Sequence, residues 1–207
     1  SIEQFQPELA GRTTHLTHGM IKLQGGQKMS SRKGNVLLAT DVLHAARIAH
    51  KEAMGADNND AVLGAVKYAF LKQRIGGDII YDPKESVSLE GNSGPYLQYA
   101  HARARSILRK AQAQPDVPLA GFDPAERSLA RKIGEYPEIV ERAVSELLPH
   151  HVCTYLYDLA QSFNRFYEHA KVVGDPREAT RLRLVWLYAD VLKDGLTLLG
   201  IAAPEQM

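Results

Sequence analysis

One short segment, residues 28–35, gathers residue types that suit a polyphosphate. Its sequence is Lys-Met-Ser-Ser-Arg-Lys-Gly-Asn. Lysine and arginine neutralise phosphate oxygens, hydroxyl groups donate hydrogen bonds to them, and glycine lets backbone N–H groups approach closely. A basic Ser/Gly loop is more often a solvated turn than a binding site, so the rest of the chain must decide between the two.

A second segment, residues 91–105, combines aromatic, amide and guanidinium groups. Those groups belong to Tyr96, Gln98, Tyr99, Arg103 and Arg105. A helix that begins at Pro95 places Tyr96, Tyr99 and Arg103 on one face. Rings stack on unpaired bases, amides bond to base edges and arginine binds phosphate, so this face suits RNA. The alternative is that the tyrosines pack into a bundle and the arginines are solvated.

The elements that must position these segments are mainly helices. Capping residues and apolar periodicity predict helices over residues 42–54, 59–76 and 95–112, and further helices that begin near residues 124, 137, 149 and 176. The last one carries leucines at steps of three and four and ends at Gly200. Residues 15–23 are expected to form a strand or two extended pieces, and residues 79–89 an extended link. We expect a domain boundary near Ser93-Gly94.

Composition and charge exclude several classes of protein. The 207 residues are 44% hydrophobic, with no run long enough to cross a bilayer. The only cysteine, Cys153, excludes an intrachain disulfide and lies in an apolar stretch, so we expect it to be a core residue in a cytoplasmic protein. The histidines show no zinc-site spacing, and we expect no structural metal. The net charge is only +1, but residues 10–40 and 91–115 contain no acidic residue, which leaves two basic patches.

The motifs together resemble one family of enzymes. Residues 28–34 resemble the KMSKS signature of class I aminoacyl-tRNA synthetases. Pro-Tyr-Leu-Gln-Tyr-Ala-His-Ala-Arg, residues 95–103, is similar to the start of the anticodon-binding domain of arginyl-tRNA synthetases. The similarity continues in order along the chain, through residues 18–20, 65–68, 155–160, 163–167 and 198–207.

This resemblance implies a mainly α fold with two parts. Residues 1–94 would be the C-terminal end of a class I nucleotide-binding, Rossmann-like domain. They would carry the KMSKS-like loop and the connecting helices. Residues 95–207 would be a helical-bundle anticodon-binding domain.

The resemblance also implies roles for the basic loop. It would close over ATP, bound with Mg²⁺, and stabilise the pyrophosphate leaving group as arginine attacks the α-phosphate. The implied ATP-binding residues are Lys28, Met29, Ser30, Ser31 and Gly34, and the implied catalytic residues are Lys28, Ser30, Arg32 and Lys33. Ser31 stands where the motif has its second lysine. Arg32 or Lys33 would supply the missing charge, and the choice between them stays open.

The resemblance implies an RNA-binding role for the second segment and for the chain end. The implied contacts with arginine tRNA are Tyr96, Gln98, Tyr99, Arg103, Arg105, Tyr167 and Met207. No tightly bound cofactor and no membrane are expected, and we expect a monomer.

One motif of the family does not occur in this sequence. Class I synthetases need a His-x-Gly-His motif, and His15-Leu16-Thr17-His18 lacks its glycine. We therefore expect a C-terminal piece of the enzyme that is inactive alone, with residues before about Thr40 poorly packed. The alternatives are a cysteinyl or class I lysyl synthetase, a stand-alone RNA-binding module, and a helical scaffold without a ligand.

Overall fold

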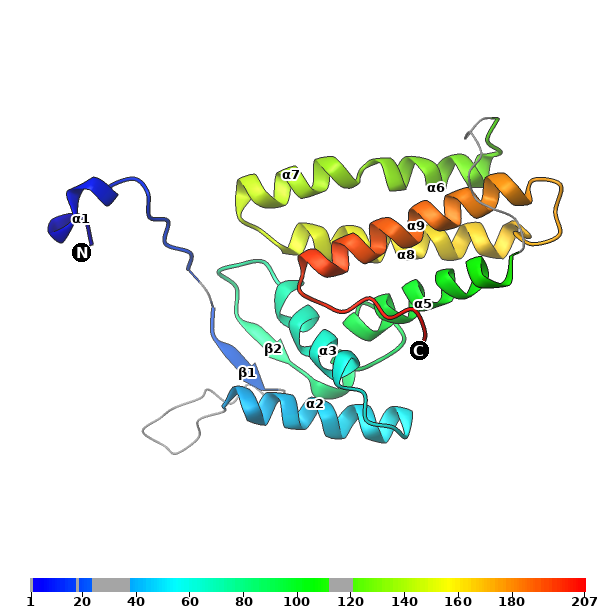
Figure 1. Ribbon diagram of the computed structural model, residues 1–207. Coiled ribbons are helices and arrows are strands. Elements are labelled where there is room, and N and C mark those ends of the chain that lie inside the picture. Colours follow the sequence, from blue (N-terminus) through cyan, green and yellow to red (C-terminus); the bar gives the residue numbers. More distant parts are fainter. Residues whose placement is uncertain (1, 18, 24–37, 112–120) are drawn as a thin grey trace.

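The computed structural model describes residues 2–17, 19–23, 38–111 and 121–207 (Figure 1). In this part of the chain most residues are helical, which confirms the expected mainly α class. The N-terminal part contains α1 (Ile2–Phe5), the 3₁₀ turn η1 (Pro7–Leu9), β1 (Ile21–Leu23), α2 (Ala39–Met54), α3 (Asn59–Leu71), β2 (Ile79–Tyr81) and α4 (Pro83–Ser86). The C-terminal part contains α5 (Gly94–Lys110), α6 (Pro124–Gly134), α7 (Tyr136–Glu146), α8 (His150–His169) and α9 (Glu178–Leu198).

The two strands form a small parallel sheet in the N-terminal part. Ile21 pairs with Ile79 and Leu23 with Tyr81. Helices α2 and α3 pack beside this sheet around Val42, Val62 and other small apolar residues (Figure 1). Residues 79–89 are therefore not a simple extended link, because they form a strand followed by the short helix α4. Asp82 caps that helix by accepting hydrogen bonds from the backbone of Lys84 and Glu85.

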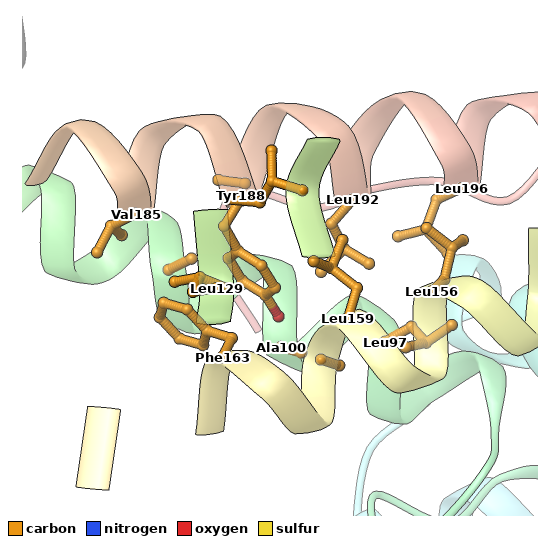
Figure 2. Close-up of a cluster of buried hydrophobic side chains, with 14 of the residues drawn as sticks. Leu97, Ala100, Leu129, Leu156, Leu159, Phe163, Val185, Tyr188, Leu192 and Leu196 are labelled. Atoms are coloured by element: carbon orange, nitrogen blue, oxygen red, sulfur yellow. The ribbon is translucent and has the colours of Figure 1, made fainter. Parts of the chain in front are cut away.

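The larger core lies between the helices of the C-terminal part (Figure 2). Phe163 of α8 stacks on Tyr188 of α9, with ring centroids 4.0 Å apart and planes within 7°. Leu156 and Leu159 fill the same space from α8, and the expected leucine stripe of α9 faces them. Cys153 is fully buried here, and burial raises the pKa of its thiol to about 12. It is a packing residue, as expected.

Helix α5 joins the two parts by packing against both α3 and α9. Its first turn crosses α3 so closely that a Cβ atom on Gly94 would lie 2.3 Å from the Gly64 carbonyl oxygen. The hydroxyl of Tyr68 in α3 donates to the Cys153 carbonyl oxygen of α8 at 3.0 Å. The first contact sets α5 against α3, and the second joins α3 directly to the bundle.

Local capping chemistry shifts three of the predicted helix ends. Asp41 is the third residue of α2, where its carboxylate accepts from the Leu38 N–H, so the helix begins before the expected cap. Helix α3 ends at Leu71 because the backbone then tightens, with the Gln73 N–H bonded to the Phe70 carbonyl. Helix α9 begins at Glu178 because Asp175 is used in a turn, where it accepts from the Arg177 N–H and pairs with Arg181.

A buried ion network connects the start of α6 to the start of α9. Glu126 completes the predicted capping box with Asp123, and its side chain is fully buried. Arg177 Nε donates to Glu126 Oε1 at 2.8 Å, and Arg181 Nε donates to the same oxygen at 2.9 Å. The hydrogen bonds from Arg177 are the largest cause that lowers the pKa of Glu126 to about 2.

None of the helices in the described part of the chain has the length and apolar content needed to cross a bilayer. Within the same residues, no three His, Cys, Asp or Glu side chains are grouped so that they could hold a metal ion.

Candidate nucleic-acid interface

The residues expected to bind ATP lie outside the described part of the chain. They are Lys28, Met29, Ser30, Ser31, Arg32, Lys33 and Gly34. The structure describes the strand that precedes these residues and the helix that follows them. Strand β1 ends at Leu23 before the segment, and α2 begins at Ala39 after it. The roles of the loop residues stay predictions.

The second predicted segment forms the start of α5. Ser93 caps this helix, since its hydroxyl accepts from the Tyr96 N–H at 3.1 Å. Pro95 lies in the first turn, where its fixed φ suits the helix and its missing N–H costs nothing. The cap and the proline fix where the helix begins.

Tyr99, Arg103 and Met207 meet at one groove of about 420 Å³. The groove lies between α5 and the end of the chain, with Arg109 and Gln206 also in its lining. Tyr99 is 44% exposed and Met207 is 47% exposed. An aromatic ring, a flexible thioether and two guanidinium groups at one groove suit an unpaired base with its phosphate.

Arg103 also borders a second groove, of about 470 Å³, on the α8 side of α5. Its guanidinium carbon lies 4.8 Å from the centre of the Tyr167 ring. Lys110 and Lys171 add positive charge to the same groove. The predicted residues Tyr99, Arg103, Tyr167 and Met207 therefore form one continuous surface, which we call the α5 surface.

Tyr96 follows the packing alternative and does not belong to this surface. It is half-buried, its ring centroid lies 5.7 Å from that of Tyr157, and its hydroxyl accepts from Asn164 Nδ2 at 3.0 Å. Burial raises the pKa of the Tyr96 phenol. Tyr96 thus attaches α5 to α8.

Gln98 requires a clear correction, because its side chain is fully buried and is not available to a base. Its Nε2 donates to the carbonyl oxygens of Asp60, at 3.2 Å, and Ala202, at 2.9 Å. The first belongs to α3 and the second to the chain end. Gln98 therefore ties the last residues of the chain to the junction between α3 and α5.

Other polar residues of α5 hold the same end of the chain, residues 200–207, which we call the tail. His101 Nδ1 donates to the Pro204 carbonyl oxygen at 2.9 Å, and burial lowers the pKa of that ring. Arg105 Nε bonds to Glu205 Oε2 at 2.6 Å, which lowers the pKa of the Glu205 carboxyl. Arg109 Nη1 donates to the Glu205 carbonyl oxygen at 2.8 Å. Arg105 thus positions the tail in this structure, whereas the prediction gave it a direct contact with tRNA.

Sequence reasoning missed His101 and Glu205 as parts of this region, and it counted Arg109 only as a member of the basic patch. One signal in the sequence could have indicated this contact. The segment of α5 carries several arginines and no acid, and Glu205 is an acid near the chain end that could pair with them. Sequence reasoning also gave Lys67 no role in this region, yet its ammonium group donates to the Gly200 carbonyl oxygen. Together these contacts set where Met207 lies.

Comparisons with known proteins assign the part of the chain that carries the α5 surface to a known domain family. The model of the DALR anticodon binding domain family matches residues 97–207. An arginine–tRNA ligase of Streptococcus equi is 38% identical over 94% of this chain and 37% of its own length. One from Frankia casuarinae is 41% identical over 93% of this chain and 36% of its own length.

A solved structure agrees with the sequence relatives. The arginyl-tRNA synthetase of Thermus thermophilus is similar with a TM-score of 0.83 and 35% identity, over 97% of this chain and 37% of that one. The chain thus spans somewhat more than a third of the length of these relatives. The resemblance to arginyl-tRNA synthetases is confirmed. Since the family model covers more than half of its residues, the protein belongs to the DALR anticodon-binding domain family.

Proposed function

We propose that this chain provides the tRNA-binding domain and the ATP-side loop of an arginine–tRNA ligase. The observation that carries the tRNA-binding part is the α5 surface, where Tyr99, Arg103, Tyr167 and Met207 lie together and are accessible. The ligase would activate arginine with ATP to arginyl-adenylate, release pyrophosphate, and transfer the arginyl group to its tRNA. The ligase would act in the cytoplasm.

The α5 surface has the parts that recognition of an unpaired anticodon base requires. Tyr99 offers an exposed ring for stacking, and Met207 can close over a base from the other wall of the groove. Arg103 stays on its ring partner Tyr167 and still presents N–H donors to a phosphate. Because the buried tail contacts hold Met207, the groove is formed before RNA arrives, which reduces the ordering cost of binding.

The proposal for the loop rests on its residue types and on the elements that flank it. Strand β1, which pairs in parallel with β2, precedes this segment and helix α2 follows it, which is the order of strand and helix in a nucleotide-binding unit. Lys28 and Ser30 would hold ATP, supplied with Mg²⁺, and Arg32 or Lys33 would stabilise charge on the leaving pyrophosphate. Since no His-x-Gly-His motif occurs in the sequence, we expect this chain alone not to activate arginine. We expect it to be a monomer.

A binding experiment tests the tRNA-binding part. Filter binding would compare the chain with arginine tRNA transcripts that carry the natural or an altered anticodon. We expect tighter binding to the natural anticodon. Tyr99→Ala should weaken that binding roughly 5- to 100-fold, the cost of one lost stacking contact. Tyr99→Phe keeps the ring and is the matched control, with affinity close to that of the unaltered chain. Equal binding to every transcript would refute anticodon recognition.

A further inference from the structure

A further groove in the described part of the chain lies away from the α5 surface. It is a groove of about 680 Å³ between α6 and α8. We call it the α6–α8 groove. Its polar lining includes Arg127, Ser128 and Arg131 from α6 and Gln161, Ser162 and Arg165 from α8. Three guanidinium groups from two helices therefore surround one open space.

The arginines of this groove differ from the other arginines of the bundle. In residues 94–111 and 121–207, the remaining arginine side chains all have partners. Arg105, Arg109, Arg142, Arg177 and Arg181 bond to carboxylate or carbonyl oxygens, and Arg103 and Arg183 lie over aromatic rings. Arg131 and Arg165 have no such partner among these residues, and Arg127 has only a 3.4 Å bond to the Phe122 carbonyl. The arginines without a strong internal partner are thus collected in one groove.

The groove also has two acidic residues, Glu135 and Asp158, which share one lysine. Lys132 pairs with Glu135 at 2.9 Å and lies 3.8 Å from Asp158. The hydroxyl of Tyr155 bonds to the Lys132 carbonyl oxygen at 2.8 Å, so this end of α6 faces the first half of α8. Arg165 lies seven residues beyond Asp158, about 10 Å further along the helix axis. Three arginines and Lys132 against Glu135 and Asp158 leave the lining of the groove with a net charge of +2.

We propose that the α6–α8 groove binds the phosphate backbone of RNA without reading its sequence. Guanidinium groups bind phosphate in a bidentate manner, and the serine and glutamine side chains of the lining can donate further hydrogen bonds. None of the lining residues is aromatic, so the groove offers phosphates a site but gives bases nothing on which to stack.

The groove is also placed to extend the proposed tRNA-binding surface. Arg165 of the groove and Tyr167 of the α5 surface are two residues apart on α8. The two surfaces therefore occupy two flanks of one helix, separated by about 10 Å. An RNA strand that binds both surfaces would have to pass around α8. This inference rests on the proposed function, since its ligand is the same tRNA.

The salt dependence of tRNA binding tests the proposal. Affinity would be measured between 50 and 200 mM salt for the chain and for Arg131→Gln/Arg165→Gln, with natural and altered anticodons. Each lost phosphate contact lowers the slope of log affinity against log salt by about one, so the double variant should lose about two. The loss should be the same for both anticodons. Arg142→Gln/Arg183→Gln removes the same charge from arginines that have internal partners, and its slope should stay nearly unchanged.

Crosslinking gives an independent readout of the same site. A benzophenone attached to Ser128→Cys should crosslink to both transcripts, whereas one attached to Glu138→Cys, exposed on α7, should not. The native Cys153 is buried and is not expected to take the label.

The possible outcomes separate the two proposals. An unchanged slope for the groove variant, or an equal drop in the control, would overturn the groove as a phosphate site while anticodon discrimination remained intact. A poly-glutamate peptide that bound the unaltered groove as tightly as tRNA would overturn its assignment to RNA. No binding of any transcript by the unaltered chain would overturn the proposed function and this inference together.

Discussion

Glutamine in place of Glu126 should destabilise the chain strongly at neutral pH. The side chain is fully buried, and two guanidinium groups bond to its carboxylate. Glutamine has nearly the same volume and can still accept from a backbone N–H, so packing and capping change little. The charge is lost, and Arg181, which is only 8% exposed, is left with weaker partners in Asp123 and Asp175.

The size of the effect follows from the pKa of this carboxyl. A group with a pKa of about 2 in the folded chain and 4.5 in the unfolded chain contributes about 3 kcal/mol of stability at pH 7. Removal of one member of a buried ion pair costs about 3–5 kcal/mol, which agrees. We therefore expect a loss of about 3 kcal/mol, or roughly 6–12 °C in Tm for a chain of this length.

The pH dependence gives the sharper test. Because folding lowers the pKa of Glu126, its contribution is complete above the unfolded pKa of 4.5 and is lost as pH falls toward 2. The difference between the unaltered chain and Glu126→Gln should shrink to about 1 kcal/mol at pH 2.5. Urea unfolding at both pH values, followed by circular dichroism, would measure it.

Glu141→Gln is the control for this experiment, because Glu141 is exposed on α7 and belongs to no such network among the described residues. It should change stability by less than about 0.5 kcal/mol. A difference below 1 kcal/mol for Glu126→Gln at pH 7 would refute the reasoning. A difference that is equal at both pH values would show that the effect comes from packing and not from charge.

Three further substitutions test other features of the fold by the same urea measurement. Gln98→Leu should cost about 1–3 kcal/mol, because it removes the donor that joins the Asp60 and Ala202 carbonyl oxygens, and it should speed hydrogen exchange in residues 201–205; unchanged exchange there would contradict the tail contact. Gly94→Ala should cost about 1–3 kcal/mol, since its methyl group would overlap the Gly64 carbonyl, whereas Gly134→Ala, which meets nothing within 4 Å, should be neutral or slightly stabilising. Tyr188→Phe should be neutral or stabilising, since its buried hydroxyl has no partner in the described structure; a loss above 1 kcal/mol would reveal one.

The parts of the fold that were predictable from sequence depend on neighbours in the chain. The capping box of Asp123 and Glu126, and the cap of α5 next to Pro95, need only residues within one turn. The apolar stripe of α9 is likewise a periodic local pattern. Helix ends were predicted less well where a candidate capping residue has another partner, as for Asp175, whose carboxylate pairs with Arg181.

The site was predictable only in part, because burial depends on contacts that sequence spacing does not contain. Tyr99 and Gln98 are adjacent residues of one helix, yet one is exposed and the other is fully buried. The difference arises from the carbonyl of Ala202, which is 104 positions away from Gln98. Motif similarity assigned both residues to RNA, since it carries no information about which side of α5 meets the tail. The roles of Lys28 and its neighbours rest on similarity alone.

The attached tail has a practical consequence for the handling of this protein. Residues 200–205 are held by side chains of α3 and α5, and Met207 lies at the groove beside Tyr99. An affinity tag fused after Met207 would start inside that groove and compete with whatever enters it. Residues 4–8 are exposed, and α1 lies apart from the other helices in Figure 1, so a tag is better placed at that end of this chain. Binding data from a C-terminally tagged preparation would report the tag as well as the protein.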